Sequence, residues 1–282
     1  MRPYSRVYAT VNLDAVASNM RSMRDNLPAS TLIMGSVKAD GYGHGSVPVA
    51  KTIEPYVFGY AVATIDEGII LRRHGINKTI LILGVTHESR YEDLLRYDIR
   101  TAMFQYEKAK KLSDLALKQG KKAVVHLALD TGMSRIGMKA DREHAKEAAA
   151  IAALEGIEVE GLFTHFARAD ETDKSAYEEQ YRRYKEFLGY LKELGVKIPI
   201  RHCSNSAGIV ESLESNHMDM VRAGIAIYGM YPSDEVDHNS VKLTPAMEIK
   251  SCITYIKEIE AGTAVSYGGT FVADQVLKVL KK

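Results

Sequence analysis

The feature that most constrains the fold of this chain is a repeated alternation of short apolar runs with stretches of helical periodicity. The runs, rich in β-branched residues, lie at 31–37, 56–62, 79–83, 99–104, 123–129, 159–164, 198–203 and 218–221. The stretches at 105–118, 140–153 and 177–194 place apolar residues at three- and four-residue steps, which is typical of amphipathic helices. This alternation predicts a parallel α/β sheet covered by helices.

Eight strand-and-helix units predict a closed (β/α)8 barrel, the TIM barrel. The alternative is an open doubly wound sheet, in which a GxGxxG phosphate loop is expected after the first strand. Residues 41–45 read GYGHG and lack that spacing. The pattern therefore favours the barrel.

Two segments fall outside the predicted barrel. Residues 7–13 form an extra strand before the first helix, which begins near Asp14. After Pro245 we expect long strands at 247–259 and 264–273, joined by a turn at 260–262 and followed by a Leu/Val/Lys tail at 275–282. The chain is thus expected to contain an N-terminal strand at 1–13 associated with a β-domain, a barrel at 14–241, and part of a C-terminal β-domain at 242–282.

Composition argues against several classes of function. The 282 residues include 37 basic and 36 acidic side chains, a formal net charge of +1, so electrostatics favours neither nucleic acid nor an anionic membrane as partner. No apolar run approaches the ~20 residues of a membrane span, and the N-terminus does not read as a secretory signal. Cys203 and Cys252 are too few for a disulfide framework or a structural zinc site. We expect a cytoplasmic protein without a bound metal.

Reactive side chains occur at the ends of the predicted strands, where barrels of this type build their active sites. Lys38 follows the first strand, Arg135 the fifth, His165 the sixth and Arg222 the eighth. A lysine amine that has lost its proton is a nucleophile toward carbonyl carbon. Taken singly, these residues also fit ordinary structural roles: a solvated lysine, a satisfied core histidine, an arginine paired with a surface carboxylate. Their convergence on one rim predicts a site.

Small residues follow the seventh and eighth predicted strands, where barrels often bind phosphate through backbone N–H groups. They include Asn205 and Ser206 after the seventh strand, and Gly224 and Ile225 after the eighth. The same residue types also suit helix N-caps and tight turns. With Lys38 on the same rim, a phosphorylated aldehyde becomes a sensible ligand.

Six segments of the chain resemble motifs of the pyridoxal-phosphate-dependent alanine racemases of fold type III, in the family's order. The segment at 37–45 closely resembles the family's cofactor signature. The six segments are VKADGYGHG at 37–45, DTGMSRIG at 130–137, THFA at 164–167, NSAG at 205–208, RAGI at 222–225 and VSYG at 265–268.

The resemblance implies pyridoxal 5′-phosphate as cofactor and assigns roles to these residues. Lys38 would bind the cofactor covalently and act as one acid–base group, with Tyr267 as the other. Arg222 would face the pyridine nitrogen, with His165 beside it behind the tyrosine. Arg135 would hydrogen-bond the cofactor's phenolic oxygen and contact the substrate. The remaining cofactor-binding positions implied are Tyr42, Asn205, Ser206, Gly224 and Ile225.

The implied reaction is the racemisation of L-alanine to D-alanine, an isomerase activity that would supply D-alanine for peptidoglycan. Racemisation removes a proton from one face of the substrate and delivers one to the other, so a two-base mechanism is expected. The resemblance also implies a head-to-tail homodimer with shared active sites, in which Tyr267 reaches the site of the partner subunit.

Two departures from the family pattern keep other functions open. Many relatives carry a carbamylated lysine at the position of Ala128, so a bound anion or a neighbouring side chain must restrain Arg135 here. The family's β-domain also continues further than 242–282, so we expect a chain truncated in that domain. The alternatives are a non-catalytic or impaired pyridoxal-phosphate-binding barrel, a racemase of serine or another small amino acid, and a lysine-dependent aldolase.

Overall fold

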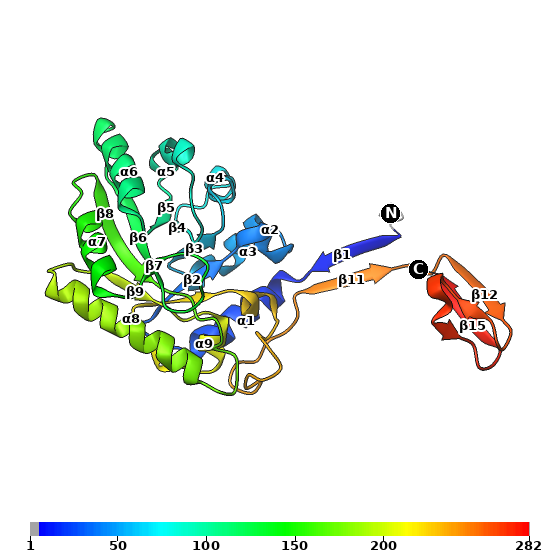
Figure 1. Cartoon of the computed structure of the whole chain (residues 1–282). Coiled ribbons are helices and arrows are strands. Elements are labelled where there is room, and N and C mark those ends of the chain that lie inside the picture. The colour runs from blue at the N-terminus through cyan, green and yellow to red at the C-terminus, as the bar shows by residue number, and fades with distance from the viewer. Residues whose placement is uncertain (1–5, 282) are drawn as a thin grey trace. The chain divides into compact units, whose positions relative to one another are not determined.

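The computed structural model describes residues 6–281. Contacts divide the chain into two compact units. The larger unit is Leu13–Ala246, and the other combines the described residues of Met1–Asn12 and Met247–Lys282. Figure 1 labels the elements of both units. Residues 1–5 of the predicted N-terminal segment, and residue 282 of the predicted tail, lie outside the described residues.

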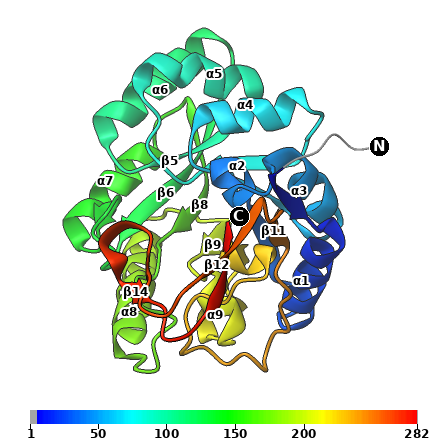
Figure 2. The ribbon, with the colours of Figure 1, turned by 90° about the vertical axis from the view of Figure 1, so that its right-hand side faces the viewer.

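The larger unit is built on parallel strands that close into a barrel (Figure 2). Hydrogen bonding runs in the order β5-β4-β3-β2-β10-β9-β8-β6, and pairing of β5 with β6 closes the ring. This closure confirms the predicted (β/α)8 barrel and excludes the open doubly wound sheet. The barrel strands in the described chain are β2 (Leu32–Ser36), β3 (Gly59–Val62), β4 (Thr79–Ile82), β5 (Arg100–Met103), β6 (Ala123–Asp130), β8 (Ile157–Phe163), β9 (Ile200–His202) and β10 (Met220–Ala223), with the short β7 (Met138–Lys139) beside β6.

Helices connect the strands and form an outer ring around the barrel (Figure 2). The stretches at 105–118, 140–153 and 177–194 correspond to α6, α7 and α8. The α-helices are α1 (Leu13–Asp25), α2 (Lys38–Tyr42), α3 (Ser46–Ile53), α4 (Ile65–Arg73), α5 (Tyr91–Tyr97), α6 (Tyr106–Lys118), α7 (Arg142–Ala152), α8 (Ser175–Glu193) and α9 (Ser206–Val210). Short 3-10 helices are η1 (Glu54–Tyr56), η2 (Glu88–Arg90), η3 (Glu214–His217) and η4 (Ile225–Tyr228).

The barrel strands bury side chains on both faces. Alternate residues such as Ile33 and Val62 join the large core beneath the helices. Their neighbours Met34 and Ala61 instead form a separate cluster with Leu81. Because successive side chains of a strand point to opposite faces, this second cluster fills the inside of the barrel. The interior is therefore packed with side chains, as expected of this fold.

The pairing of β6 with β8 contains an irregularity. Val125 pairs with Val159 and His126 with Gly161, so Glu160 is an extra residue on β8. Such a β-bulge bends the strand and interrupts the ladder. It also brings His126 against the backbone at Gly161, where a Cβ atom would lie 2.4 Å from the histidine Nδ1.

The second unit contains antiparallel strand pairs. β1 (Val7–Val11) pairs with β11 (Met247–Ser251), β12 (Tyr255–Ile259) with β15 (Leu277–Lys281), and β13 (Ala264–Val265) with β14 (Phe271–Val272). The expected strand at 247–259 is interrupted at 252–254, where Cys252 N–H donates to the carbonyl of Arg6. That these strands begin a β-domain stays a prediction.

One sequence expectation for this unit is wrong in detail. The expected strand at 264–273 breaks around η5 (Tyr267–Gly269), because Ser266, Gly268 and Gly269 have positive φ angles that an extended strand does not allow. The Leu/Val/Lys tail at 275–282, for which no strand was predicted, contains β15. The β-branched Val279 suits this strand, which pairs along β12 from Leu277 to Lys281.

Within residues 6–281, none of the helices combines the length and apolarity that a membrane crossing requires.

We predict that Gly161→Ala destabilises the barrel by about 2–3 kcal/mol, because the new methyl group collides with its neighbours. Its Cβ would lie 2.4 Å from His126 Nδ1 and 2.8 Å from the carbonyl oxygen of Ile200. Gly189→Ala is the matched control, since Gly189 is an exposed position of α8 with nothing within 4 Å of the added Cβ.

The control variant should be more stable than the original chain by about 0.5–1 kcal/mol. Urea denaturation followed by circular dichroism measures both changes. Equal stability of the two variants would contradict the packing described at Gly161.

Candidate active site

A cavity of about 540 Å³ lies at the C-terminal ends of the barrel strands. Its size is within the range usual for small-molecule sites. Apart from Tyr267, the predicted site residues all line it: Lys38, Tyr42, Arg135, His165, Asn205, Ser206, Arg222, Gly224 and Ile225. The structure thus brings together side chains that are widely separated along the sequence.

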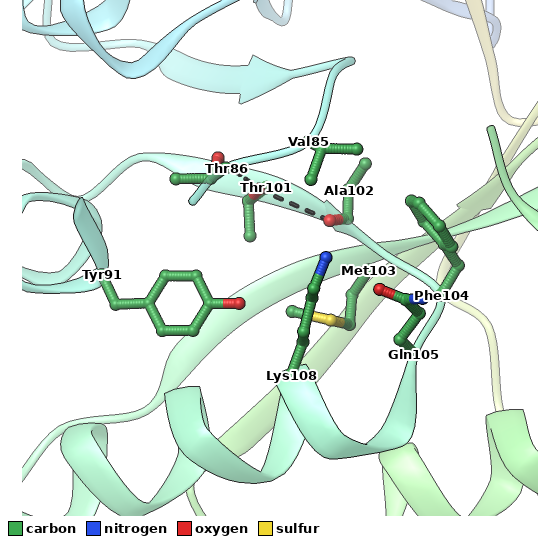
Figure 3. Close-up of a pocket in the computed structure, with 9 residues that line it drawn as sticks. All are labelled: Val85, Thr86, Tyr91, Thr101, Ala102, Met103, Phe104, Gln105 and Lys108. Atoms are coloured by element: carbon green, nitrogen blue, oxygen red, sulfur yellow. Dashed lines mark hydrogen bonds between the residues drawn. The ribbon is translucent and has the colours of Figure 1, made fainter. Parts of the chain in front are cut away.

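A second pocket, near the start of α6, is too small to hold a comparable ligand (Figure 3). Its volume is about 10 Å³, roughly the space that one water molecule needs. Thr86 and Thr101 share a hydrogen bond of 2.9 Å on one side of it, and Lys108 points toward it from α6. We therefore place the candidate site in the larger cavity.

Lys38 begins a turn, α2, whose backbone is left-handed. The φ angles are 50° at Ala39, 50° at Asp40, 62° at Gly41 and 53° at Tyr42. This conformation costs L-residues roughly 1–2 kcal/mol each, so a run of them persists only where surrounding contacts determine it. Strain of this kind is common at functional sites.

Two carboxylates hold the left-handed turn. Glu67, in the first turn of α4, accepts from Ala39 N–H at 2.8 Å and from Ala63 N–H at 2.7 Å. Asp40 accepts from Ser46 N–H at 2.8 Å. The turn is therefore tied both to the next barrel loop and to α3, which fixes the point from which the Lys38 side chain departs.

A small polar recess lies beside Gly224. Ser206 Oγ accepts from Gly224 N–H at 2.9 Å and from Ala226 N–H at 3.3 Å. A Cβ at Gly224 would lie 3.4 Å from Ser206 Oγ and 3.6 Å from Tyr42 Oη. Neither hydroxyl donates to an acceptor among the described residues, so both O–H groups are available to a ligand. Asn205 already caps α9 by accepting from Gly208 N–H at 3.1 Å.

Arg222 is buried in β10 itself, not after the strand as the sequence suggested. Its Nη1 donates to Nδ1 and to the carbonyl of His202, at 2.9 and 3.0 Å. Its Nη2 donates to the carbonyls of Thr164 and Cys203, at 2.7 and 3.0 Å, and lies 3.3 Å from His165 Nδ1. A guanidinium has five N–H donors. Within the described chain, Nε–H is the Arg222 donor that has no acceptor.

The cavity is electropositive but contains a neutral imidazole. Burial lowers the pKa of Arg222 to about 10, so the guanidinium stays cationic at neutral pH. Burial, together with the charges of Arg222, Arg135 and Lys38, lowers the pKa of His165 to about 3. Concentrated positive charge in a cleft favours an anionic ligand.

Arg135 and Ala128 bear on how the predicted cofactor contact is restrained. Arg135 lines the cavity with an exposed side chain, and no group in the described part of the chain forms an ion pair or hydrogen bond with it. Ala128 is buried against Ala102 and Phe163. Of the two alternatives, a neighbouring side chain that restrains Arg135 is not found among residues 6–281, and a bound anion stays a prediction.

Tyr267, the predicted second acid–base group, belongs to the smaller unit. It begins η5, its side chain is fully exposed, and it follows Ser266, whose φ of 66° is unusual for a residue other than glycine. Its catalytic role stays a prediction.

Sequence reasoning missed the groups that support the cavity. They are His126, Glu160 and His202, which form hydrogen bonds behind Arg222, and Glu67, which holds the left-handed turn after Lys38. The available signal was a histidine inside each of two predicted buried strands, at 123–129 and 198–203.

Comparisons with known proteins identify the family. The family model of the alanine racemase N-terminal domain matches residues 11–232. The chain is 43% identical over 270 residues to an alanine racemase of Desulforamulus reducens, covering 95% of this chain and 73% of that protein. This chain belongs to the alanine racemase family.

Other members and structures agree with this assignment to a family of isomerases. An alanine racemase of Clostridium perfringens is 42% identical over 274 residues, covering 97% of this chain and 70% of that protein. A solved alanine racemase of Clostridium difficile 630 is 40% identical with a TM-score of 0.91, covering 99% of this chain and 73% of that one. A histidine racemase of Leuconostoc mesenteroides, 24% identical with a TM-score of 0.85, shows only that it shares the fold.

We predict that Ala39→Gly stabilises the protein by about 0.5–1 kcal/mol, because glycine adopts the left-handed conformation at Ala39 without strain. Ala150→Gly is the matched control, since Ala150 is exposed in the right-handed helix α7. There the same substitution should destabilise by about 1 kcal/mol. Thermal and urea unfolding measure both. Destabilisation of equal size at both positions would contradict a left-handed turn after Lys38.

The lowered pKa of His165 predicts acid sensitivity. Its folded value of about 3 lies below the ordinary value of ~6.5 in the unfolded chain, so the unfolded chain binds one more proton between these limits. The free energy of unfolding therefore falls as the pH drops below ~6.5. From about pH 7 to about pH 5.5, His165 should account for about 1 kcal/mol of this loss.

Urea unfolding of the original chain and of His165→Asn at these two pH values tests the assignment. The variant should lose about 1 kcal/mol less than the original chain on acidification. Identical losses would show that His165 is not held in its neutral form.

Proposed function

We propose that this chain binds pyridoxal 5′-phosphate in the barrel-mouth cavity and catalyses the racemisation of L-alanine. The observation that carries the proposal is the presence, in one cavity, of three kinds of group. Lys38 provides an amine, Tyr42 and Ser206 provide free hydroxyl donors beside Gly224, and Arg222 provides an N–H donor without an acceptor.

These groups fit the three recognisable parts of the cofactor. The amine of Lys38 suits the aldehyde, to which lysine side chains bind covalently. The two hydroxyls, with the backbone N–H of Ile225, suit the phosphate, next to Gly224, whose own N–H donates to Ser206 Oγ. The free Nε–H of Arg222 suits the pyridine nitrogen, which is an acceptor. When bound, the cofactor supplies an electron sink for negative charge at the substrate α-carbon.

Arg222 would donate a hydrogen bond to the pyridine nitrogen without transferring its proton. A guanidinium is a donor that gives up its proton very reluctantly, and carbonyls at the ends of two strands, β8 and β9, hold it in place. It therefore offers the pyridine nitrogen a hydrogen bond and not a full proton. The resulting electron sink is weaker, which favours rapid return of a proton to the α-carbon, as racemisation requires.

Lys38 would exchange a proton with the substrate α-carbon on one face. The opposite face needs a second group, which we assign to Tyr267 of the partner subunit in a head-to-tail homodimer. The full exposure of the Tyr267 side chain supports this assignment. Arg135, at the cavity wall, would hydrogen-bond the cofactor's phenolic oxygen and contact the substrate. The product D-alanine would serve peptidoglycan synthesis in the cytoplasm.

Alanine is favoured as substrate because the relatives that share 40–43% of their residues with this chain are named alanine racemases. Serine and other small amino acids are the alternatives to include in an assay. A chain that binds the cofactor without racemising any of them would instead be a pyridoxal-phosphate-binding barrel.

The proposal predicts a visible absorption band on adding pyridoxal 5′-phosphate, fixed by borohydride onto Lys38 and located by mass spectrometry. In D2O, L-alanine should lose its α-proton and be converted to D-alanine. Absence of any attachment at Lys38 would overturn the proposal, whereas attachment without α-proton exchange would leave only the binding role.

Tyr267→Phe is predicted to lower racemisation by roughly 10²–10⁴-fold, the range for loss of an acid–base group, while attachment of the cofactor to Lys38 is unchanged. Tyr255→Phe is the matched control, because Tyr255 is also an exposed tyrosine of the smaller unit. Chiral chromatography of the product measures both. Normal racemisation by the Tyr267 variant would refute the two-base assignment.

A further inference from the structure

A chain of buried polar side chains extends behind Arg222, away from the cavity lining. Arg222 Nη1 donates to His202 Nδ1 at 2.9 Å, and His202 Nε2 lies 2.8 Å from His126 Nδ1. His126 Nε2 lies 2.9 Å from Glu160 Oε2, which is also 3.4 Å from Arg100 Nε. Both histidines are fully buried, and neither lines the cavity. The side chains of His202, His126, Glu160 and Arg100 have no part in the function proposed above.

The two ends of this chain determine where its protons lie. Arg222 can only donate, so the Arg222–His202 hydrogen bond exists only while His202 Nδ1 is unprotonated and accepts. A neutral His202 then carries its proton on Nε2 and donates to His126 Nδ1. His126 in turn carries its proton on Nε2 and donates to Glu160, which as a carboxylate only accepts. The pure donor at one end and the pure acceptor at the other therefore allow one set of tautomers.

The charge states are consistent with this direction. Burial holds the pKa of His202 well below its ordinary value, and the charge of Arg222 adds to the effect. Burial likewise lowers the pKa of His126. Burial works against ionisation of Glu160, but the hydrogen bond from His126 and the charge of Arg100 outweigh it and lower its pKa. Two neutral imidazoles thus connect a cation to an anion.

We propose that Glu160 is a positioning residue for Arg222, acting through His126 and His202. By accepting from His126 Nε2–H, Glu160 selects the tautomers that leave His202 Nδ1 free to accept from Arg222. This contact and the three carbonyls occupy the terminal nitrogens of the guanidinium, so that its Nε–H is left for the cavity. The inference rests on the proposed function only in what that Nε–H serves.

The β-bulge supports a specific role for Glu160. The extra residue on β8 is Glu160 itself, and Gly161 beside it gives His126 the space it occupies. If the acceptor at position 160 is lost, His126 Nε2–H is left without a partner, which is costly for a buried group. His126 then gains by moving its proton to Nδ1. His202 must accept that bond, so its own Nδ1–H comes to face Arg222 Nη1, donor against donor.

Two substitutions separate the negative charge of Glu160 from its role as a hydrogen-bond acceptor. Glu160→Gln removes the charge but keeps an oxygen that can accept from His126 and Arg100, whereas Glu160→Met has a similar size and no such acceptor. The first measurement is 15N NMR of histidine-labelled, cofactor-free protein, with the His202 signals assigned by their loss in His202→Gln. We expect protonated Nε2 and unprotonated Nδ1 at His202 in the original chain and in Glu160→Gln, and Nδ1 protonation in Glu160→Met.

The second measurement is racemisation by the cofactor-loaded proteins. Glu160→Met should lower kcat by roughly tenfold or more, comparable to losses when groups that orient metal ligands are removed, with little change in KM. Glu160→Gln should remain within about threefold of the original chain, because the acceptor that orients His126 is retained. A general structural defect would not produce this difference together with the change of tautomer.

Three results would overturn the proposal. One is a protonated Nδ1 at His202 in the original chain, which is decisive even if Glu160→Met does not fold. Another is an unchanged His202 tautomer in folded Glu160→Met. The third is a loss of kcat in Glu160→Gln equal to that in Glu160→Met. Failure of the original chain to bind cofactor or to racemise would refute the proposed function, but the NMR result would still decide the role of Glu160.

Discussion

The candidate site depends on the burial of one guanidinium at the mouth of the barrel. An isolated buried charge is very costly unless hydrogen bonds satisfy it. Arg222 meets this requirement through carbonyls of Thr164, His202 and Cys203, which lie at the ends of neighbouring strands. The ends of β8 and β9 must therefore sit at fixed positions around β10. The requirement that keeps the arginine buried also holds this side of the cavity in shape.

The part of the cavity next to it, formed by the left-handed turn after Lys38, is held by different interactions, and it follows β2, which pairs with β10. The turn after Lys38 has a left-handed backbone, which is unfavourable for Ala39 and Asp40. The carboxylate of Glu67 on α4 and the turn's own Asp40, which accepts from Ser46 N–H, keep it in place. The surroundings of Arg222 are thus fixed by the hydrogen bonds that satisfy its charge. The turn after Lys38 is fixed by hydrogen bonds that offset the strain of its backbone. In both cases the restraining groups lie outside the set that would touch a ligand, so the ligand-facing groups are positioned before any ligand binds.

The sequence predicted the barrel and most of its cavity for clear physical reasons. Strand runs and helical periodicities are local, and in a parallel barrel the residues that follow strands meet at one end. Lys38, Arg135, His165 and Ser206 could therefore be placed together without coordinates. Arg222 was misplaced by a residue or two, because strand boundaries depend on ladder hydrogen bonds that periodicity does not reveal.

The support behind the cavity could not be predicted in the same way. The left-handed turn after Lys38 requires contacts from Glu67, 29 residues further along the chain. The hydrogen bonds of His126 and His202 link strands that are 76 residues apart. The pairing of β15 with β12 likewise depends on a partner that the local pattern does not identify. The roles of the cavity residues, including Tyr267, go beyond what either periodicity or geometry decides.

The extra residue on β8 has a consequence for how the gene could change. Side chains on a strand alternate, yet Val159 and Leu162 both face the helices, with Phe163 directed to the interior. Deleting the codon for Glu160 would remove the interruption and leave each of these side chains on its present side. Deletion of this one residue would therefore give a regular strand, and the packing of the neighbouring side chains would not prevent it. What such a lineage would lose is the single carboxylate that gives the two interior imidazoles their orientation.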